Sequence, residues 1–173
     1  MRTYTYKVVG DLKIEADVYR ADGSEFRPVL VWLHGGALMM GAKKDVPQDL
    51  MELARSEGYC VVSANYRLAP QAKLPQIIED IQDFMRWVGE KGPGMFHADA
   101  SKVVVTGGSA GGYLTMMTGI MEPRAKGLVA YYGYGDVDGP WYVTPSEHYR
   151  KQPLVSKEDA YQGMTPAVVT ESG

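Results

Sequence analysis

A glycine-rich pentapeptide, Gly107-Gly108-Ser109-Ala110-Gly111, holds the residue best suited to covalent chemistry in this sequence. It follows the apolar run Val103 to Thr106 and precedes a helical pattern, so Ser109 is expected on a sharp strand-to-helix turn. On such a turn the serine hydroxyl stands clear of the sheet, and the first helical amides, from Ala110 onward, face developing negative charge. The simpler alternative is a tight turn in which Ser109 only caps the helix. The pentapeptide alone leaves both interpretations open.

A second motif, His34-Gly35-Gly36-Ala37, stands at the end of the apolar run Val29 to Leu33. Ligand sites in open α/β sheets gather at the carboxyl ends of strands, so this loop and Ser109 are expected to converge. The small residues after His34 leave backbone N–H groups exposed, and such groups can stabilise an oxyanion. His34 itself is expected to orient its own loop, because the general base follows the serine in this architecture.

Together with Tyr66-Arg67-Leu68-Ala69-Pro70, these motifs make the chain resemble the hormone-sensitive-lipase-like, HGG-type bacterial carboxylesterases of the α/β-hydrolases. The resemblance covers Val29 to about Gly112, and Asp80 and Trp87 resemble the family's acidic, Trp-containing helix. It implies that Ser109 attacks a small carboxylic ester and forms an acyl-enzyme, with neither cofactor nor metal. It also implies an oxyanion hole, which we assign to the backbone amides of Gly35, Gly36, Ala37 and Ala110.

Two positions depart from the family pattern. Ala37 stands where glycine is usual, and Gly108 stands where the family most often has an acidic residue. Neither change removes a backbone donor, so neither by itself predicts a loss of function.

Supporting roles are expected for two charged residues and a group of aromatic ones. Arg67 follows a predicted strand end, where its guanidinium can tie loop carbonyls and carboxylates together. Asp80 is either its partner or, with Asp83, part of a solvated helix face. Six aromatic residues could wall an apolar pocket or simply pack under a loop: Tyr131, Tyr132, Tyr134, Trp141, Tyr142 and Tyr149.

The elements that must position these residues follow from hydrophobic periodicity. Residues 4–9 and 12–19 read as an antiparallel hairpin, and residues 29–33, 59–64, 102–106 and 127–132 read as buried strands. Helical patterns lie between them, from about Pro47 to Gly58, over 74–88 and over 110–121. This alternation predicts an α/β-hydrolase fold: a mostly parallel, doubly wound sheet with an N-terminal antiparallel hairpin. We expect a core over residues 1–134 and an incomplete cap-like insertion over residues 135–173.

The rest of the catalytic machinery is not identifiable. A serine nucleophile in this fold needs a carboxylate and then a histidine later in the chain. The segment after Ser109 has room for one helix, one strand and the insertion, so the later strands are expected to be missing. His148 is interpreted as a surface residue, and Asp136 and Asp138 as turn formers.

The chain is therefore expected to be the N-terminal part of a hydrolase: a fragment, a subunit, or a natural short protein. Expressed alone it should be inactive, with residues 127–132 left as an apolar sheet edge. A complementing C-terminal chain or a homo-oligomer is the expected protein partner. The competing hypothesis is a non-catalytic small-molecule binder or half-domain on the same scaffold.

Composition narrows the remaining classes. The 173 residues carry a net charge of −3 without any Lys/Arg run, which argues against nucleic acid and anionic membranes as partners. No apolar stretch approaches the roughly 18 residues of a spanning helix, and no secretory signal is recognisable, so a cytoplasmic protein is expected. The single cysteine, Cys60, lies in an apolar run and is expected to be a buried, inert thiol.

Overall fold

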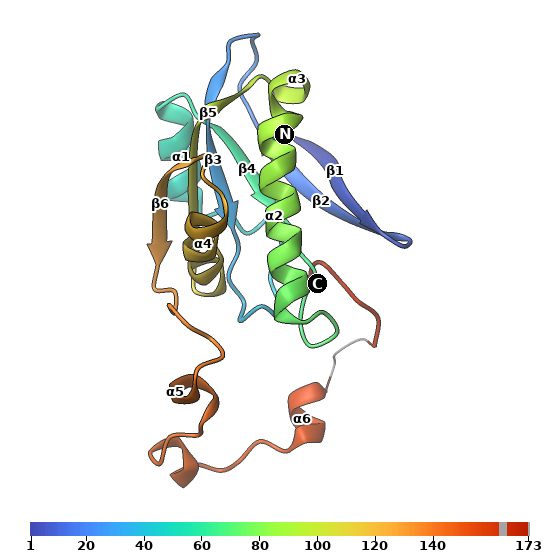
Figure 1. The fold of residues 1–173 in the computed structure, drawn as a ribbon, viewed down its shortest axis with the longest axis vertical. Helices are drawn as coiled ribbons and strands as arrows, with labels where there is room; N and C mark the ends of the chain where they lie inside the picture. Colours follow the sequence, from blue (N-terminus) through green and yellow to red (C-terminus); the bar gives the residue numbers. More distant parts are fainter. Residues whose placement is uncertain (163–165, 173) are drawn as a thin grey trace.

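The computed structural model describes residues 1–162 and 166–172 (Figure 1). A six-stranded sheet has the order β1-β2-β4-β3-β5-β6. β1 (Arg2–Val9) and β2 (Leu12–Tyr19) form an antiparallel hairpin, and β2 pairs antiparallel with β4 (Cys60–Ala64). β3 (Arg27–Leu33), β5 (Ala98–Gly108) and β6 (Ala125–Tyr131) complete a parallel set with β4. The predicted fold class, a mostly parallel sheet with an N-terminal hairpin, is confirmed.

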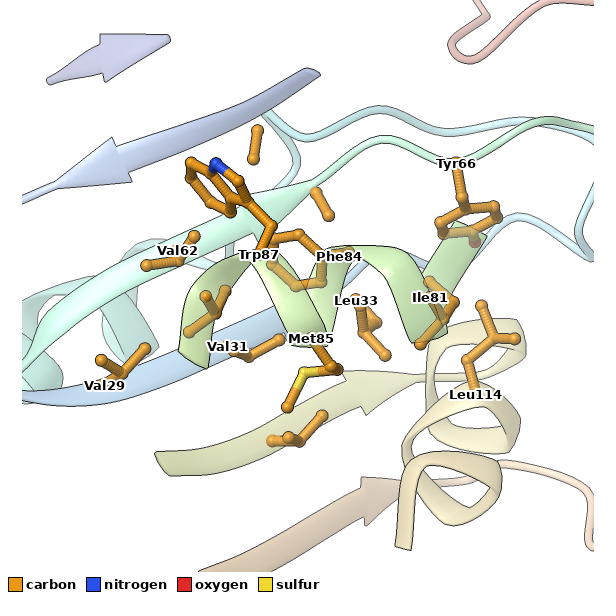
Figure 2. Close-up of a cluster of buried hydrophobic side chains, with 14 of the residues drawn as sticks. Val29, Val31, Leu33, Val62, Tyr66, Ile81, Phe84, Met85, Trp87 and Leu114 are labelled. Carbon is orange, nitrogen blue, oxygen red and sulfur yellow. The ribbon is translucent and has the colours of Figure 1, made fainter. Parts of the chain in front are cut away.

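Both faces of the central strands are covered, which explains their continuous apolar sequence. Val29, Val31 and Leu33 of β3 pack in the main core under α2 (Leu74–Glu90) and α4 (Ala110–Met121), as Figure 2 shows. Leu30, between them in sequence, packs on the other face near α1 (Gln48–Ser56). A short helix, α3 (Gly92–Phe96), leads into β5. Cys60 is buried, and burial raises its thiol pKa to about 11, as expected for an inert thiol.

The α2 helix begins where the sequence pattern places it. Pro75 lies in its first turn, where a missing N–H costs nothing, and the backbone N–H of Lys73 donates to Gln76 Oε1 at 2.8 Å. Ile77, Ile81 and Phe84 then fall on one face and point into the core. The α2 helix is therefore packed against the sheet, and Leu74 and Ile77 of its first turns lie near Ser109.

β6 forms one edge of the sheet. Within the described residues it pairs with β5 alone, and its Leu128, Val129 and Tyr131 side chains are 43%, 43% and 44% exposed. The expectation of an apolar edge is therefore confirmed. None of the described helices combines the length and apolar character needed to cross a bilayer.

Beyond β6 the chain leaves the sheet (Figure 1). It forms three short elements without buried residues: α5 (Pro140–Val143), η1 (Tyr149–Lys151) and α6 (Lys157–Tyr161). Residues 166–172 then return to the main body, where Val169 packs against the core and Thr170 is buried. The expected irregular insertion thus includes a returning segment that the sequence pattern did not indicate.

Candidate active site

Ser109 lies at the turn between β5 and α4 with φ 56° and ψ −117°. A positive φ in a non-glycine residue costs on the order of 1–3 kcal/mol, so the surroundings must impose it. The Ser109 N–H donates to Tyr131 O at 2.9 Å, and the Ser109 carbonyl accepts the Tyr113 N–H at 3.0 Å. The side chain is exposed, and it makes no capping hydrogen bond to α4. Ser109 is therefore the N-cap residue of α4 by position, as one interpretation expected, but its hydroxyl does not cap the helix.

Two glycines of the pentapeptide let the turn pack directly on the end of β3. A Cβ atom at Gly107 would lie 2.6 Å from Leu33 O and would collide with the Gly111 carbonyl. A Cβ at Gly111 would collide with Leu33 O and lie 2.7 Å from His34 O. Any larger side chain at either position would separate the turn from the His34 loop.

The His34 loop and the Ser109 turn meet. A Cβ at Gly35 would lie 3.5 Å from the Ser109 Cβ. Gly36, Ala37 and Leu38 adopt successive positive φ values of 108°, 55° and 62°. The Gly36 carbonyl accepts the N–H groups of both Met39 and Met40, at 2.9 and 3.0 Å.

The loop leaves backbone donors free. Within residues 1–162 and 166–172, the N–H groups of Gly36 and Ala37 make no hydrogen bond to the protein. Ala37 adopts a left-handed conformation although it is not a glycine. The alanine that departs from the family pattern therefore keeps its backbone N–H as a donor. Both amides are therefore unpaired donors in the loop that abuts the Ser109 turn.

A largely apolar cavity of about 370 Å³ opens over Ser109. Ala37 and Ala110 lie in its wall with Ser109, whereas Gly35 and Gly36 line a separate open pocket beside Gly41 and Ser172. Only Tyr134 and Tyr142 of the six aromatic residues singled out in the sequence line it; Tyr131 and Tyr132 line a separate cleft with Trp32. The remaining lining residues are Leu38, Met39, Ala69, Leu74, Ile77, Tyr113, Val137 and Asp138.

Tyr113 was missed at the sequence level. It follows Ser109 by one helical turn, which is the signal that could have identified it. Burial raises the pKa of its phenol, and the nearby Asp138 and Asp136 carboxylates raise it further. The Tyr113 phenol is therefore neutral at pH 7, and the residue lines a largely apolar cavity.

His34 is buried and contacts the backbone of its own loop. Its ring is 1% exposed, stacks on Tyr66 at 4.2 Å between centroids, and places Nδ1 2.8 Å from Gly35 O. The Tyr66 hydroxyl donates to His34 O at 2.8 Å. Burial lowers the pKa of His34, so the imidazole is neutral at pH 7. This geometry agrees with a loop-orienting role.

Arg67 and Asp80 form a buried pair. Asp80 Oδ2 accepts Arg67 Nε–H at 2.8 Å and Arg67 N–H at 3.0 Å, while Oδ1 accepts Nη2–H at 2.7 Å. Lys7 Nζ of β1 lies 2.8 Å from Asp80 Oδ1 and 2.7 Å from Asp83 Oδ2. The hydrogen bonds to Asp80 raise the pKa of Arg67 above its already high ordinary value.

One of the two interpretations of Asp80 is therefore wrong. The Asp80 side chain is 0% exposed, so it does not belong to a solvated face, whereas Asp83 is 25% exposed. Two cations from distant parts of the chain converge on this side of α2, and their charge allows a carboxylate to be buried. The alternative, a partnership with Arg67, is confirmed.

No general base is in contact with Ser109 in the part of the chain that the structure describes. His97 ends α3, before β5 begins, and the exposed His148 packs edge-on against Tyr149 at 5.2 Å. Asp136 Oδ1 accepts the N–H groups of Asp138 and Gly139, both at 2.9 Å. Asp136 is therefore a turn former, as predicted.

The sheet, the strained serine turn and the glycine loop define an α/β-hydrolase. The chain belongs to the BD-FAE family, whose model matches residues 16–141. This match confirms the predicted resemblance to the hormone-sensitive-lipase-like carboxylesterases.

Solved structures agree with this assignment. An esterase from Pyrobaculum calidifontis is 30% identical with a TM-score of 0.65, over 87% of this chain and 54% of that one. A thermostable carboxylesterase cloned from a metagenomic library is 29% identical with a TM-score of 0.63, over 72% and 44%. A Staphylococcus aureus protein of unknown function, 20% identical, shares the fold at a TM-score of 0.80, over 99% and 60%.

Curated relatives include much longer proteins. A non-reducing polyketide synthase of Aspergillus calidoustus is 29% identical over 178 residues, which is 92% of this chain and 7% of the synthase. One of Stereocaulon alpinum is 30% identical over 77% of this chain and 6% of that protein. The chain thus spans less than a tenth of these synthases and at most 60% of the solved structures described above.

Proposed function

We propose that this chain is the nucleophile-bearing part of a serine hydrolase that cleaves carboxylic esters of small acyl groups. The observation that carries the proposal is the exposed, non-capping hydroxyl of Ser109, held at φ 56° in a cavity that it shares with Ala37 and Ala110. Membership of the BD-FAE family and the likeness to two solved esterases support it.

In the proposed reaction, Ser109 Oγ attacks the acyl carbon while its proton passes to a histidine base. The carbonyl electron pair moves onto oxygen, where the amides of Gly35, Gly36, Ala37 and Ala110 form the oxyanion hole. The C–O bond then breaks, and the alcohol leaves with the proton from the base. Water attacks the acyl-serine in the same way, releasing the carboxylic acid and restoring the hydroxyl.

The base must come from polypeptide outside the described residues. We propose a complementing segment, continuous with this chain or supplied by a second one, that lies along β6. The exposed apolar side chains of Leu128, Val129 and Tyr131 favour this location, because covering them removes an aggregation-prone edge. A homo-oligomer formed through β6 is the alternative partner.

A fluorophosphonate probe tests the proposal. The assembly is isolated through a tag on this chain, together with the polypeptide that copurifies. Attack by Ser109 Oγ displaces fluoride from phosphorus and leaves a stable phosphonyl-serine. We expect one label at Ser109, loss of labelling in Ser109→Ala, and unchanged labelling in Ser101→Ala, which alters an exposed serine. A folded, complete assembly that takes no label would contradict the esterase assignment.

The second candidate is a non-catalytic binder on the same scaffold. It is favoured by the lack of any histidine in contact with Ser109 among the described residues, together with the apolar cavity. A binder would retain an apolar ester without hydrolysing it, and Ser109→Ala would leave its affinity unchanged. The esterase would instead turn the ester over and lose turnover in that variant.

A further inference from the structure

The returning segment, residues 166–172, runs against the loop that follows the proposed oxyanion donors. Gly41 N–H donates to Ser172 Oγ at 2.9 Å, and Ser172 N–H donates to Gly41 O at 3.2 Å. Further back, Val169 O accepts the Leu68 N–H at 2.9 Å. Figure 1 shows this segment beside the start of α2. The Staphylococcus aureus structure overlaps 99% of the chain, so its fold extends over this segment as well.

Asn65 lies at the centre of this junction, immediately after β4, and is 2% exposed. Its Oδ1 accepts the Lys43 N–H at 2.6 Å, and its Nδ2 donates to Glu171 Oε2 at 3.1 Å. The Lys43 ammonium lies 3.8 Å from the same carboxylate oxygen. One buried amide thus ties the loop to the returning segment.

The junction abuts the oxyanion loop directly. Gly41 has φ 100°, and a Cβ there would lie 2.5 Å from His34 Nδ1 and 2.6 Å from Gly35 O. Gly41 therefore packs against the backbone that precedes the free amides of Gly36 and Ala37. The loop needs such support, because Ala37 and Leu38 hold positive φ values that are costly for residues with side chains.

We propose that Asn65 and residues 169–172 form a clasp that holds the Gly36–Gly41 loop in its observed conformation beside the Ser109 turn. In this proposal Asn65 is a positioning residue: it touches no substrate, and it acts through Lys43, Glu171 and Gly41. The role in catalysis rests on the proposed function, because it presumes that this loop is the oxyanion loop.

An exchange of side chains across the Asn65–Glu171 contact tests the clasp. In Asn65→Asp the new carboxylate still accepts the Lys43 N–H, but it faces the Glu171 carboxylate. Lys43 cannot neutralise it fully, since Glu15, Asp17 and Glu171 already lie within 3.7–3.9 Å of its ammonium. Asn65→Asp combined with Glu171→Gln restores a donor and an acceptor in reversed order.

Amide hydrogen exchange of the whole chain gives the first readout. We expect the Gly41 and Ser172 amides to exchange about 5- to 10-fold faster in Asn65→Asp, a loss comparable to one hydrogen bond. Exchange should return to within about twofold of wild type in the double variant. Glu171→Gln alone should stay near wild type, because the Asn65 amide can still donate to the new carbonyl. Ser24→Ala, in an exposed loop, is the matched surface control.

Turnover in the complete assembly gives the second readout. A misplaced oxyanion donor weakens the transition state more than the bound ester, so Asn65→Asp should lower kcat about tenfold with KM within twofold. The double variant should recover kcat. Identical exchange rates in wild type, single and double variants would overturn the clasp. If fluorophosphonate labelling fails while the exchange pattern holds, the proposed function is wrong and the clasp remains as a structural junction.

Discussion

Removal of the buried Asp80 carboxylate should destabilise the fold far more than removal of its exposed neighbour on the same helix. Asp80 accepts three hydrogen bonds from Arg67 and pairs with Lys7, so Asp80→Ala removes the one fully buried carboxylate that these two cations share and leaves them only the exposed Glu79 in common. Breaking a buried pair in this way costs about 3–5 kcal/mol. Because ordinary domains are stable by only about 5–15 kcal/mol, much of the folded population is at risk.

A milder variant keeps the prediction measurable. Asp80→Asn preserves size and one acceptor oxygen but removes the charge, and hydrogen bonds to charged groups contribute about 1.5–3 kcal/mol. Asp83→Asn, at a partly exposed carboxylate that pairs with Lys7 and Arg86, should cost at most about 1 kcal/mol. The asparagine variants form a matched pair, since both remove a carboxylate that contacts Lys7.

Urea unfolding at pH 7, followed by tryptophan fluorescence, measures these differences. Trp87 is a suitable reporter, because it is buried on the same helix as Asp80 and packs against Tyr4 and Tyr6 of β1. The midpoint should fall in the order wild type, Asp83→Asn, Asp80→Asn, Asp80→Ala, with the urea dependence unchanged. If Asp80→Asn were no less stable than Asp83→Asn, the buried ion pairs of Asp80 would not stabilise the fold more than the partly exposed ones of Asp83.

Three further changes test other parts of the structure. Gly111→Ala should lower the free energy of unfolding by about 1–3 kcal/mol, because the new Cβ would collide with Leu33 O. Gly94→Ala is the control and should be near neutral, because its Cβ would meet nothing within 4 Å. Equal urea midpoints for the two variants would show that Gly111 does not pack closely against Leu33. Burial lowers the pKa of His34, so the unfolded chain binds a proton more readily, and stability should fall as the pH drops below about 6.5. Between pH 7.5 and 5.5, the urea midpoint should therefore fall less in His34→Gln than in His148→Gln. An equal fall in the two variants would count against a buried neutral imidazole. Val129→Lys should reduce self-association in sedimentation experiments, while Val8→Lys on the opposite edge strand, β1, should not. Equal effects of the two substitutions would show that the chains do not associate through β6.

The sequence was most informative where structure depends on local pattern. Val29 to Leu33 form a strand without polar alternation because both faces are buried, and this is visible from the run itself. The start of β5 was less predictable: it begins at Ala98, ahead of the expected Lys102, where Ala98 pairs with Arg27 across an irregularity in the register. Such an extension depends on a partner strand far away in sequence.

Long-range charge convergence was harder still to foresee. Helical spacing places Asp80 near the border of the polar face of α2, and only the arrival of Arg67 from one side and Lys7 from the other makes its burial possible. The spacing therefore allowed two interpretations, and the tertiary structure selected one. The same reasoning applies to the clasp, because nothing in the residues around Glu171 indicates that they return to Gly41.

The two halves of the candidate site differ in how they are determined. The conformation of Ser109 depends on close backbone contacts among Leu33, Gly107 and Gly111, all within the core between β3 and α4. The loop that follows His34 packs against the same turn, so in the proposed mechanism the nucleophile and the donors are preorganised together. In that mechanism, a base delivered beside β6 would meet a serine that is already exposed. Preorganised donors still accelerate the reaction about 10³- to 10⁴-fold over water when a triad member is removed, so the chain alone should retain only that small residual catalysis.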